Sequence, residues 1–252
     1  GFFASGVNSG VRAYRPDVGL IVSDSDMTAA GVFTQSEAKA APVLWSQKLV
    51  PSKKIRAIIT NSGQANAATG ELGIANNLLM VNATAAVVGC APEEVLVAST
   101  GMIGVHLNVE LINKALPELA ARVTNTAEHF ANAILTTDLV PKTISTTLKL
   151  SGGEITITGI AKGSGMIHPN MATMLGYILT DAKLEAAAAH TFLKTAVDLS
   201  FNMVSVDGDT STNDCAFLLA NGASGVDVLS AEDVALFQAT VTELSQLLAQ
   251  AI

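Results

Sequence analysis

The 252-residue sequence is poor in charged residues, in aromatic side chains and in cysteine. Only 14% of the residues are charged, and the formal net charge is −8. Because lysine and arginine form no cluster, the chain offers no basic surface for nucleic acid or anionic lipid. The two cysteines, Cys90 and Cys215, are far apart and match no Cys/His metal-ligand spacing. This pattern argues against a structural zinc site and favours two free thiols in a reducing compartment.

The sequence also lacks a recognisable targeting or membrane segment. Residues 1–3 are not part of a basic region followed by an apolar stretch, so no signal peptide is evident. The most hydrophobic run, residues 78–90, is interrupted by Asn82 and Thr84 and is too short to span a bilayer. We therefore expect a cytoplasmic protein. Because there is no initiator methionine, and no glycine stop follows the helical pattern at Ile252, we expect the chain to be incomplete.

Apolar residues make up 49% of the chain, which predicts a globular protein with a large aliphatic core. Helical and strand patterns are mixed without an internal repeat, which favours α/β or α+β layers over a simple doubly wound sheet. The clearest element is a hairpin of alternating residues 143–150 and 154–160 around Gly152 and Gly153. Further strands are expected at residues 20–23, 29–33, 56–60, 95–98, 174–179, 202–206 and 215–219, and helices at 72–88, 109–123, 127–135, 184–199 and 230–252.

Polar loops follow several expected strands, and functional groups often collect at such ends. Thr100 and Gly101 offer a hydroxyl and a backbone N–H that suit an oxyanion hole, although a turn before a helix explains the pair equally simply. Lys162 suits a carboxylate ligand or is a solvated loop residue. Thr173, where a loop enters a strand, is either a packed β-branched residue or a rigidly held nucleophile.

Other candidate chemistries are weaker. Residues 163–165 resemble a phosphate cradle, but the surrounding sequence fits neither common nucleotide-binding motif. The segment 207–214 carries three aspartates but no glutamate at the spacing of a calcium-binding loop, which favours a hydrogen-bonded turn. The four histidines show no metal-ligand spacing, and we expect all of them to be non-catalytic: His106, His129, His168 and His190.

Six segments, taken in order, resemble the ornithine acetyltransferase family, the glutamate N-acetyltransferases of arginine biosynthesis. Each segment is weak alone, but the ordered set extends over nearly the whole chain. The segments are residues 30–34, 61–70, 99–104, 136–138, 162–175 and 205–214. The resemblance implies a layered αββα sandwich of the ornithine acetyltransferase and DmpA-like type. It also implies self-cleavage at the Ala172–Thr173 bond, which divides the chain into regions 1–172 and 173–252.

The resemblance further implies a mechanism. The Thr173 hydroxyl takes an acetyl group from N-acetylornithine and passes it to glutamate, with acetyl-CoA a possible further donor and no cofactor or metal. The α-amine that cleavage creates on Thr173 can act as the general base, because α-amines titrate near neutral pH. Thr100 and Gly101 match the oxyanion-hole pair of the family. Thr136, Lys162 and Thr173 match its substrate-binding positions. The expected partner is the chain's own cleavage product, without nucleic acid or membrane.

Family members continue beyond the end of this sequence with a segment resembling Arg-Asp-Gly-Glu-Gly, whose glutamate binds substrate. That segment is absent here, which also suggests a fragment. Two alternatives remain open on the sequence: a self-processed amidohydrolase or aminopeptidase that uses the same nucleophile, and a non-catalytic module that binds amino acids.

Overall fold

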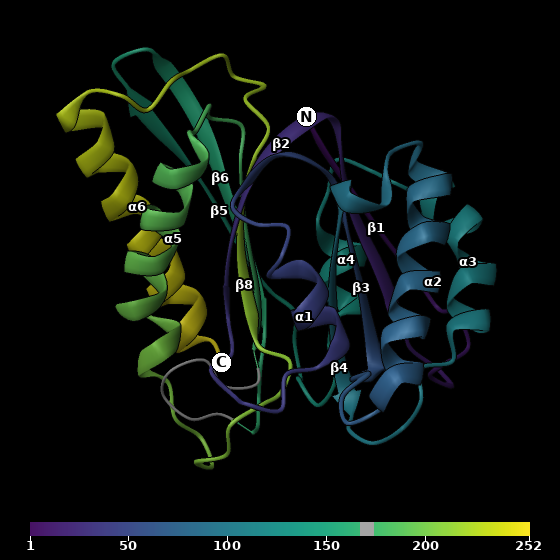
Figure 1. The fold of residues 1–252 in the computed structure, drawn as a ribbon. Coiled ribbons are helices and arrows are strands. Elements are labelled where there is room, and N and C mark those ends of the chain that lie inside the picture. Colours follow the sequence, from purple (N-terminus) through teal and green to yellow (C-terminus); the bar gives the residue numbers. More distant parts are fainter. Residues whose placement is uncertain (167–173) are drawn as a thin grey trace.

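The computed structural model describes residues 1–166 and 174–252 (Figure 1). Strands and helices are mixed along this part of the chain. The strands are β1 (Phe2–Val7), β2 (Val18–Phe33), β3 (Ser52–Gln64), β4 (Val95–Met102), β5 (Lys142–Leu150), β6 (Gly153–Lys162), β7 (Leu175–Thr180) and β8 (Cys215–Ala220). The α-helices are α1 (Ala41–Ser46), α2 (Gly70–Val88), α3 (Val109–Ala121), α4 (Glu128–Ala133), α5 (Ala186–Asp198) and α6 (Ala231–Gln250).

Strand β2 joins two layers of one hydrogen-bonded sheet. The strand order is β4-β3-β2-β8-β7-β6-β5, and β1 pairs with β2 outside this path. The first half of β2 pairs with β1 and β3, whereas its second half pairs with β8. Register shifts between Val22 and Ala29 lie between the two halves. Such irregularities bend a strand, which allows β2 to leave one layer and enter the other.

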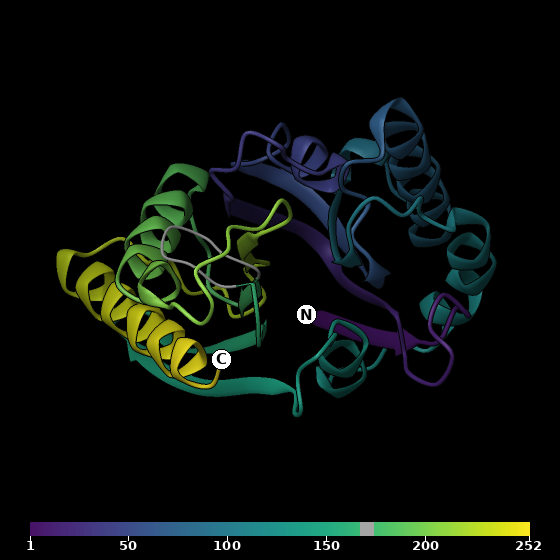
Figure 2. The ribbon, with the colours of Figure 1, turned by 90° about the horizontal axis from the view of Figure 1, so that it is seen from below.

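Helices cover the outer face of each layer. Figure 2 shows α5 and α6 outside the layer of β5 to β8, and α2 and α3 outside the layer of β1, β3 and β4. Alternate side chains of a strand point to opposite faces, so each buried strand contributes to two cores. In β8, Phe217 belongs to the inner core and Leu218 to the outer one. The predicted αββα sandwich is therefore confirmed.

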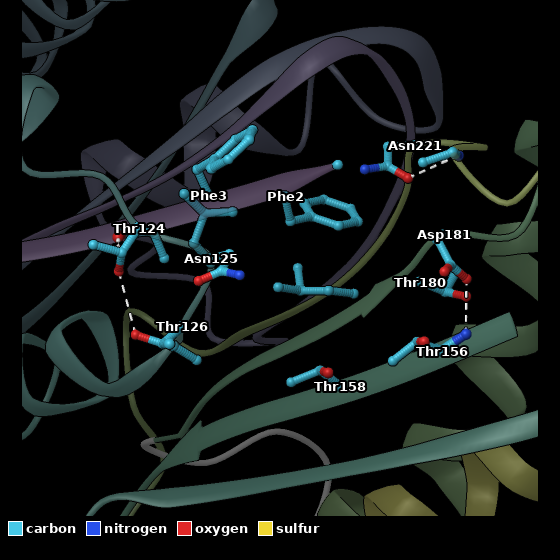
Figure 3. Close-up of a pocket in the computed structure, with 16 residues that line it drawn as sticks. Phe2, Phe3, Thr124, Asn125, Thr126, Thr156, Thr158, Thr180, Asp181 and Asn221 are labelled. Carbon is cyan, nitrogen blue, oxygen red and sulfur yellow. Dashed lines mark hydrogen bonds between the residues drawn. The ribbon is translucent and has the colours of Figure 1, made fainter.

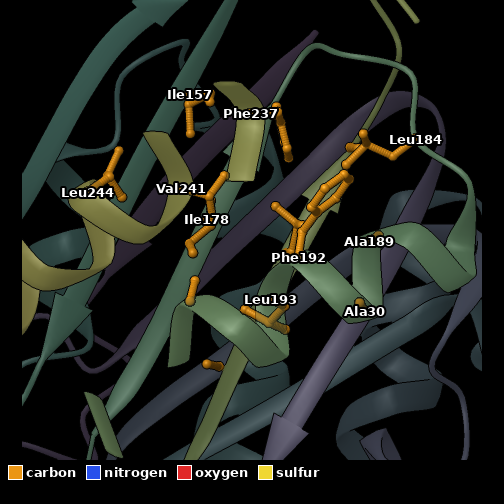
Figure 4. Close-up of a cluster of buried hydrophobic side chains, with 14 of the residues drawn as sticks. Ala30, Ile157, Ile178, Leu184, Ala189, Phe192, Leu193, Phe237, Val241 and Leu244 are labelled. Atoms are coloured by element: carbon orange, nitrogen blue, oxygen red, sulfur yellow. The ribbon is translucent and has the colours of Figure 1, made fainter. Parts of the chain in front are cut away.

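The outer core beneath α5 and α6 is aliphatic with two aromatic rings at its centre (Figure 4). Phe192 of α5 and Phe237 of α6 meet edge to face with their ring centroids 4.9 Å apart. Ile157 of β6 and Ile178 of β7 face these helices from the sheet. This packing fixes the layer whose strands β6 to β8 reach the candidate site.

The inner core contains the fully buried ring of Tyr177 on β7. This ring contacts Phe130 of α4 edge to face and stacks against Phe217 of β8. The Tyr177 hydroxyl lies 2.9 Å from Thr60 Oγ1 on β3, so a hydrogen bond crosses from one layer to the other. Because both hydroxyls are buried, each depends on the other for its hydrogen bond.

Several sequence predictions need correction. Residues 202–206 do not form a strand; the chain makes a 3-10 turn at Phe201–Met203 instead. The strands expected at 20–23 and 29–33 are parts of the single strand β2. The polar residues in the middle of β2 resemble a turn in the sequence. The predicted hairpin is confirmed as β5 and β6, which pair from Lys142–Ala161 to Leu150–Gly153. Asn108 and Ser230 cap α3 and α6, since each side chain accepts a hydrogen bond from a first-turn N–H.

Helix α2 is long and apolar enough, by length and composition alone, to cross a membrane. It nevertheless packs on the outer face of the β3–β4 layer and beside α3. Its side chains Met80, Val81 and Ala85 belong to the outer core there. These contacts are those of a core helix in a layered domain.

We predict that Tyr177→Phe lowers the free energy of unfolding by about 1 to 3 kcal/mol, because it leaves the buried Thr60 hydroxyl without a partner. Urea denaturation of the purified protein measures this loss. Thr60→Val removes the other partner, and the double variant should recover part of the loss because no hydroxyl is then left unpaired. Strictly additive losses would contradict a direct bond between the layers.

Candidate functional site

The candidate site lies where strands of both layers end on the same side of the molecule, which is the lower side in Figure 1. Thr100 is near the end of β4 in one layer, and Lys162 is the last residue of β6 in the other. Thr136 lies between α4 and β5. Ala172 and Thr173 lie outside the described residues.

The Lys162 ammonium brings three separate segments together. Its Nζ donates hydrogen bonds to Thr100 Oγ1 at 3.1 Å and to Thr136 Oγ1 at 3.2 Å. Lys162 is 1% exposed, so the alternative of a solvated loop lysine is wrong. Three of the predicted site residues are therefore in direct contact around one buried positive charge.

Burial disfavours this positive charge and lowers the pKa of Lys162 below its ordinary value. The nearby carboxylates of Asp138 and Asp214 oppose the effect of burial, whereas the Lys142 ammonium adds to it. The charge state of Lys162 thus depends on the groups packed around it.

A cavity of about 470 Å³ opens beside these residues, which is a usual size for a small-molecule site. Lys162 does not line it; the ammonium lies behind Thr100 and Thr136, which do. The lining includes both polar and apolar residues. It comprises Arg12, Gly63, Ala65, Thr100, Gly101, Met102, Ile103, Thr136, Thr137, Gly165, Met166, Ser211 and Asn213.

Close approach of two strands explains why Gly101 is glycine. Gly101 of β4 lies beside Gly63 of β3 in the parallel ladder and has a φ of +129°. A Cβ at position 101 would lie 2.2 Å from the Gly63 carbonyl carbon. A side chain cannot fit at this distance, so the cavity wall here is bare backbone.

Arg12 is a cavity residue that the sequence did not reveal. Its guanidinium donates to Ser62 Oγ and to the Thr136 carbonyl, each at 3.4 Å, and also to the Leu135 carbonyl. Burial is the main cause that lowers its pKa. Arg12 lies in an irregular segment between β1 and β2, where neither periodicity nor a motif marks it. It adds a second positive charge to the cavity.

The loop 207–214 contacts the chain on both sides of residues 167–173, at Met166 and at Met174. The Met166 N–H donates to Asp207 Oδ2 at 2.6 Å, and the Met174 N–H donates to Asp214 Oδ1 at 3.0 Å. These aspartates therefore hold the chain on either side of Thr173. Among the residues that the structure describes, no group of three or more His, Cys, Asp or Glu side chains could hold a metal ion.

Asp214 is 1% exposed, and its Oδ2 has no hydrogen-bond partner among the described residues. Burial raises the pKa of its carboxyl to about 7, against the opposing effects of the Ser211 side chain, the Met174 N–H and the Lys162 charge. Sequence reasoning placed Asp214 only in a turn; its burial depends on the layers packing around the start of β8, which no local signal reveals.

Three predicted non-catalytic histidines, His106, His129 and His190, do not line the cavity. His168 lies outside the described residues. Both cysteines are free: Cys90 is part-buried and Cys215 is buried. Burial raises the pKa of each thiol, which keeps both protonated at neutral pH.

A second cavity, of about 260 Å³, lies at the opposite end of the space between the layers (Figure 3). The Phe2 ring of β1 points into it, and Thr156 and Thr158 of β6 face that ring from the other side. It contains none of the site residues predicted from the sequence. Within the described part of the chain, the predicted site residues therefore lie at the other end of the sandwich.

Comparison with known proteins places the chain in one family. A sequence model of the ArgJ family matches residues 3–252. An "Arginine biosynthesis bifunctional protein ArgJ" of Thermotoga neapolitana is 45% identical over all of this chain and 64% of that protein. A Sorghum bicolor protein of the same name, described as chloroplastic, is 42% identical over all of this chain and 56% of its own length. The chain thus spans about three fifths of the length of these relatives.

Solved structures agree. The Bacillus halodurans argJ crystal structure is 39% identical, with a TM-score of 0.65, and the match covers 68% of this chain and 91% of that one. An ornithine acetyltransferase of Mycobacterium tuberculosis, solved with ornithine, is 34% identical, with a TM-score of 0.62 and coverages of 67% and 91%. A Burkholderia beta-aminopeptidase is 15% identical, with a TM-score of 0.59, and covers 99% of this chain and 84% of its own. This last likeness concerns the fold alone.

The raised pKa of Asp214 predicts a specific pH dependence of stability. The folded state holds a proton on this carboxyl up to about pH 7, whereas an unfolded carboxyl loses it near 3.8. The resulting stabilisation is complete below the lower value and disappears as the pH rises through the higher one. Between about pH 5 and about pH 8, the wild type should lose about 2 to 3 kcal/mol that Asp214→Asn does not lose.

Urea denaturation at a series of pH values measures this difference. Asp209→Asn is the control, because Asp209 is exposed in the same loop, and it should follow the wild type. Parallel curves for the wild type and Asp214→Asn would show that the carboxyl is not protonated in the folded state at neutral pH.

Proposed function

The chain belongs to the ArgJ family, and from this premise we propose that it acts as an acetyltransferase in arginine biosynthesis. The proposed reaction moves an acetyl group from N-acetylornithine to glutamate, with acetyl-CoA as a possible further donor. The observation that carries the proposal is the contact of Lys162 with Thr100 and Thr136 beside a cavity of small-molecule size. These residues were singled out by the sequence and come from both layers.

Thr173 is the proposed nucleophile and arises by self-cleavage. Its hydroxyl attacks the Ala172 carbonyl carbon, the peptide C–N bond breaks, and the resulting ester is opened by water. Region 1–172 then ends in a carboxylate, and region 173–252 begins with the free α-amine of Thr173. Both products are expected to stay together, because the sheet continues through β6 of one product and β7 of the other.

Acetyl transfer uses the same atoms. The Thr173 Oγ attacks the acetyl carbonyl of N-acetylornithine while the Thr173 α-amine accepts the hydroxyl proton. That proton passes to the ornithine nitrogen as the amide C–N bond breaks and ornithine leaves. The amine of glutamate then attacks the acetyl-threonine ester, which forms acetylglutamate and restores the Thr173 hydroxyl. No metal or cofactor is needed for these steps.

Thr100 and Gly101 are proposed to stabilise the oxyanion of each tetrahedral intermediate. Their support is position: both line the cavity, and bare backbone at Gly101 allows close approach of a substrate oxygen. Thr136 is proposed to contact the substrate directly, since it also lines the cavity. The positive charges of Lys162 and Arg12 suit the carboxylates that ornithine and glutamate both carry.

We predict that Thr173→Ala abolishes both reactions. Intact mass spectrometry of the natural full-length protein should show two fragments for the wild type, cut at Ala172–Thr173, and one uncut chain for the variant. Transfer of labelled acetyl from N-acetylornithine to glutamate should fall by at least about 1000-fold, as expected for loss of a nucleophile. Thr147→Ala, at an exposed position of β5, is the control and should behave as the wild type.

The same assay separates the alternatives. An aminopeptidase or amidohydrolase would release free acetate or amine instead of acetylglutamate, and a binding module would show neither cleavage nor turnover. A wild-type protein that remains uncut and still transfers acetyl groups would contradict the proposed role of Thr173.

A further inference from the structure

A buried ion pair lies directly behind the candidate site. Lys142 Nζ donates to Asp138 Oδ1 at 2.7 Å, and both side chains are almost completely buried. Buried charges are costly unless they are paired and fully hydrogen-bonded, so stability alone is a weak reason for a buried pair. The contacts of Asp138 suggest why this pair is placed here.

Asp138 is bonded to both segments that carry the site. Its Oδ1 also accepts the Gly163 N–H at 2.8 Å, which fixes the chain just after Lys162. Its Oδ2 accepts the Thr136 N–H at 3.3 Å. Burial would raise the pKa of this carboxyl, but the hydrogen bonds from Lys142 and Gly163 and the charge of Lys162 lower it overall. Asp138 is therefore a carboxylate at neutral pH.

The Lys162 ammonium in turn determines how two hydroxyls can act. An ammonium only donates hydrogen bonds, so Thr100 Oγ1 and Thr136 Oγ1 must both act as acceptors toward it. The single proton of each hydroxyl is then free to be donated elsewhere, and both threonines line the cavity. A neutral Lys162 amine has a lone pair, and it could instead accept one of these protons and take that donor away from the cavity.

We propose that Asp138, held in place by Lys142 and bonded to the Gly163 and Thr136 backbone, is a positioning device that keeps Lys162 charged. The charged Lys162 in turn keeps the Thr100 and Thr136 hydroxyls available as donors to a bound acyl group or its oxyanion. Asp138 favours the charge of Lys162, and Lys142 limits that effect by competing for the same carboxylate. The kinetic part of this inference rests on the proposed acetyltransferase function, whereas the titration part does not.

Four titratable groups act on Lys162: Asp138 and Asp214 favour its charge, Lys142 opposes it, and Cys215 lies within electrostatic range. Removing one member of the ion pair should therefore shift the titration midpoint of Lys162 in a direction that depends on which charge is removed. Asp138→Asn removes a negative charge and should lower the pH at which Lys162 loses its proton. Lys142→Met removes a positive charge and should raise that pH. A general loss of packing in the two variants would not give shifts of opposite sign.

The direct test is NMR titration of the natural full-length protein labelled with 13C at lysine Cε, with the Lys162 signal assigned by its loss in Lys162→Met. We expect its midpoint to move down by roughly one pH unit in Asp138→Asn and up in Lys142→Met, the scale of a close charge. The double variant should lie near the wild type. Lys149→Met, an exposed lysine on the same strand as Lys142, is the control.

The second readout is the pH dependence of acetyl transfer. The alkaline limb of kcat should move in the same directions as the titration, because the hydroxyl donors act on the oxyanion. Shifts in the titration without any acetyl transfer would refute the proposed function and leave the positioning device intact. Midpoints that do not move, or that move in the same direction in both variants, would overturn the inference. If Asp138→Asn does not fold, Lys142→Met alone tests the inference. A higher titration midpoint of Lys162 in that variant supports it, and an unchanged or lower midpoint overturns it.

Discussion

The shared strand β2 constrains the rest of the structure. Its first half pairs with β1 and β3, and its second half pairs with β8, so a single backbone ladder fixes the two layers relative to each other. The inner core then has to fill the space between them, and the hydrogen bond between Thr60 and Tyr177 joins its two walls. Because the layers are fixed in this way, the ends of β4 and β6 meet although 60 residues separate them in sequence.

This meeting place explains why the site is charged and buried at once. Lys162 lies at the end of β6 where successive residues are all buried, so its ammonium cannot reach bulk water and must be satisfied by protein groups. Two threonines accept its hydrogen bonds, and the Asp138 carboxylate favours its charge, as does Asp214 when it is ionised. The same arrangement places positive potential and hydroxyl groups beside the cavity without filling it. Burial, which is costly for stability, here shields from water a charge that contacts two residues proposed to act on a substrate.

The local sequence pattern was sufficient to predict many of the helices and strands. The alternation in β5 and β6 and the apolar periodicity of the long helices are encoded within a few neighbouring residues, and these elements were predicted correctly. Thr100, Gly101, Thr136 and Lys162 were singled out by their loops and by family resemblance, and the structure brings them together.

The contributions of Arg12, Asp138 and Asp214 could not be predicted in this way. Arg12 and Asp138 act through contacts between segments far apart in the chain. The pKa of Asp214 depends on how deeply its carboxyl is buried. A hydrophilic residue in a polar loop looks the same in sequence whether it is exposed or enclosed. The sequence predicted two short strands in place of β2 for the same reason. The polar middle of β2 resembles a turn in sequence, and only its pairing with β3 and β8 shows that it is one strand.

The loop 207–214 holds the chain on both sides of the proposed self-cleavage site. Asp207 holds Met166 and Asp214 holds Met174, on opposite sides of the bond proposed to break. Asp214 bonds the amide directly after Thr173, and Met174 leads at once into β7, which lies between β6 and β8. Residue 173 is thus covalently joined to a fixed amide at the start of a central strand. When the bond before it breaks, the new amine belongs to the product that is anchored in the sheet, and the nucleophile keeps its attachment to the rigid core.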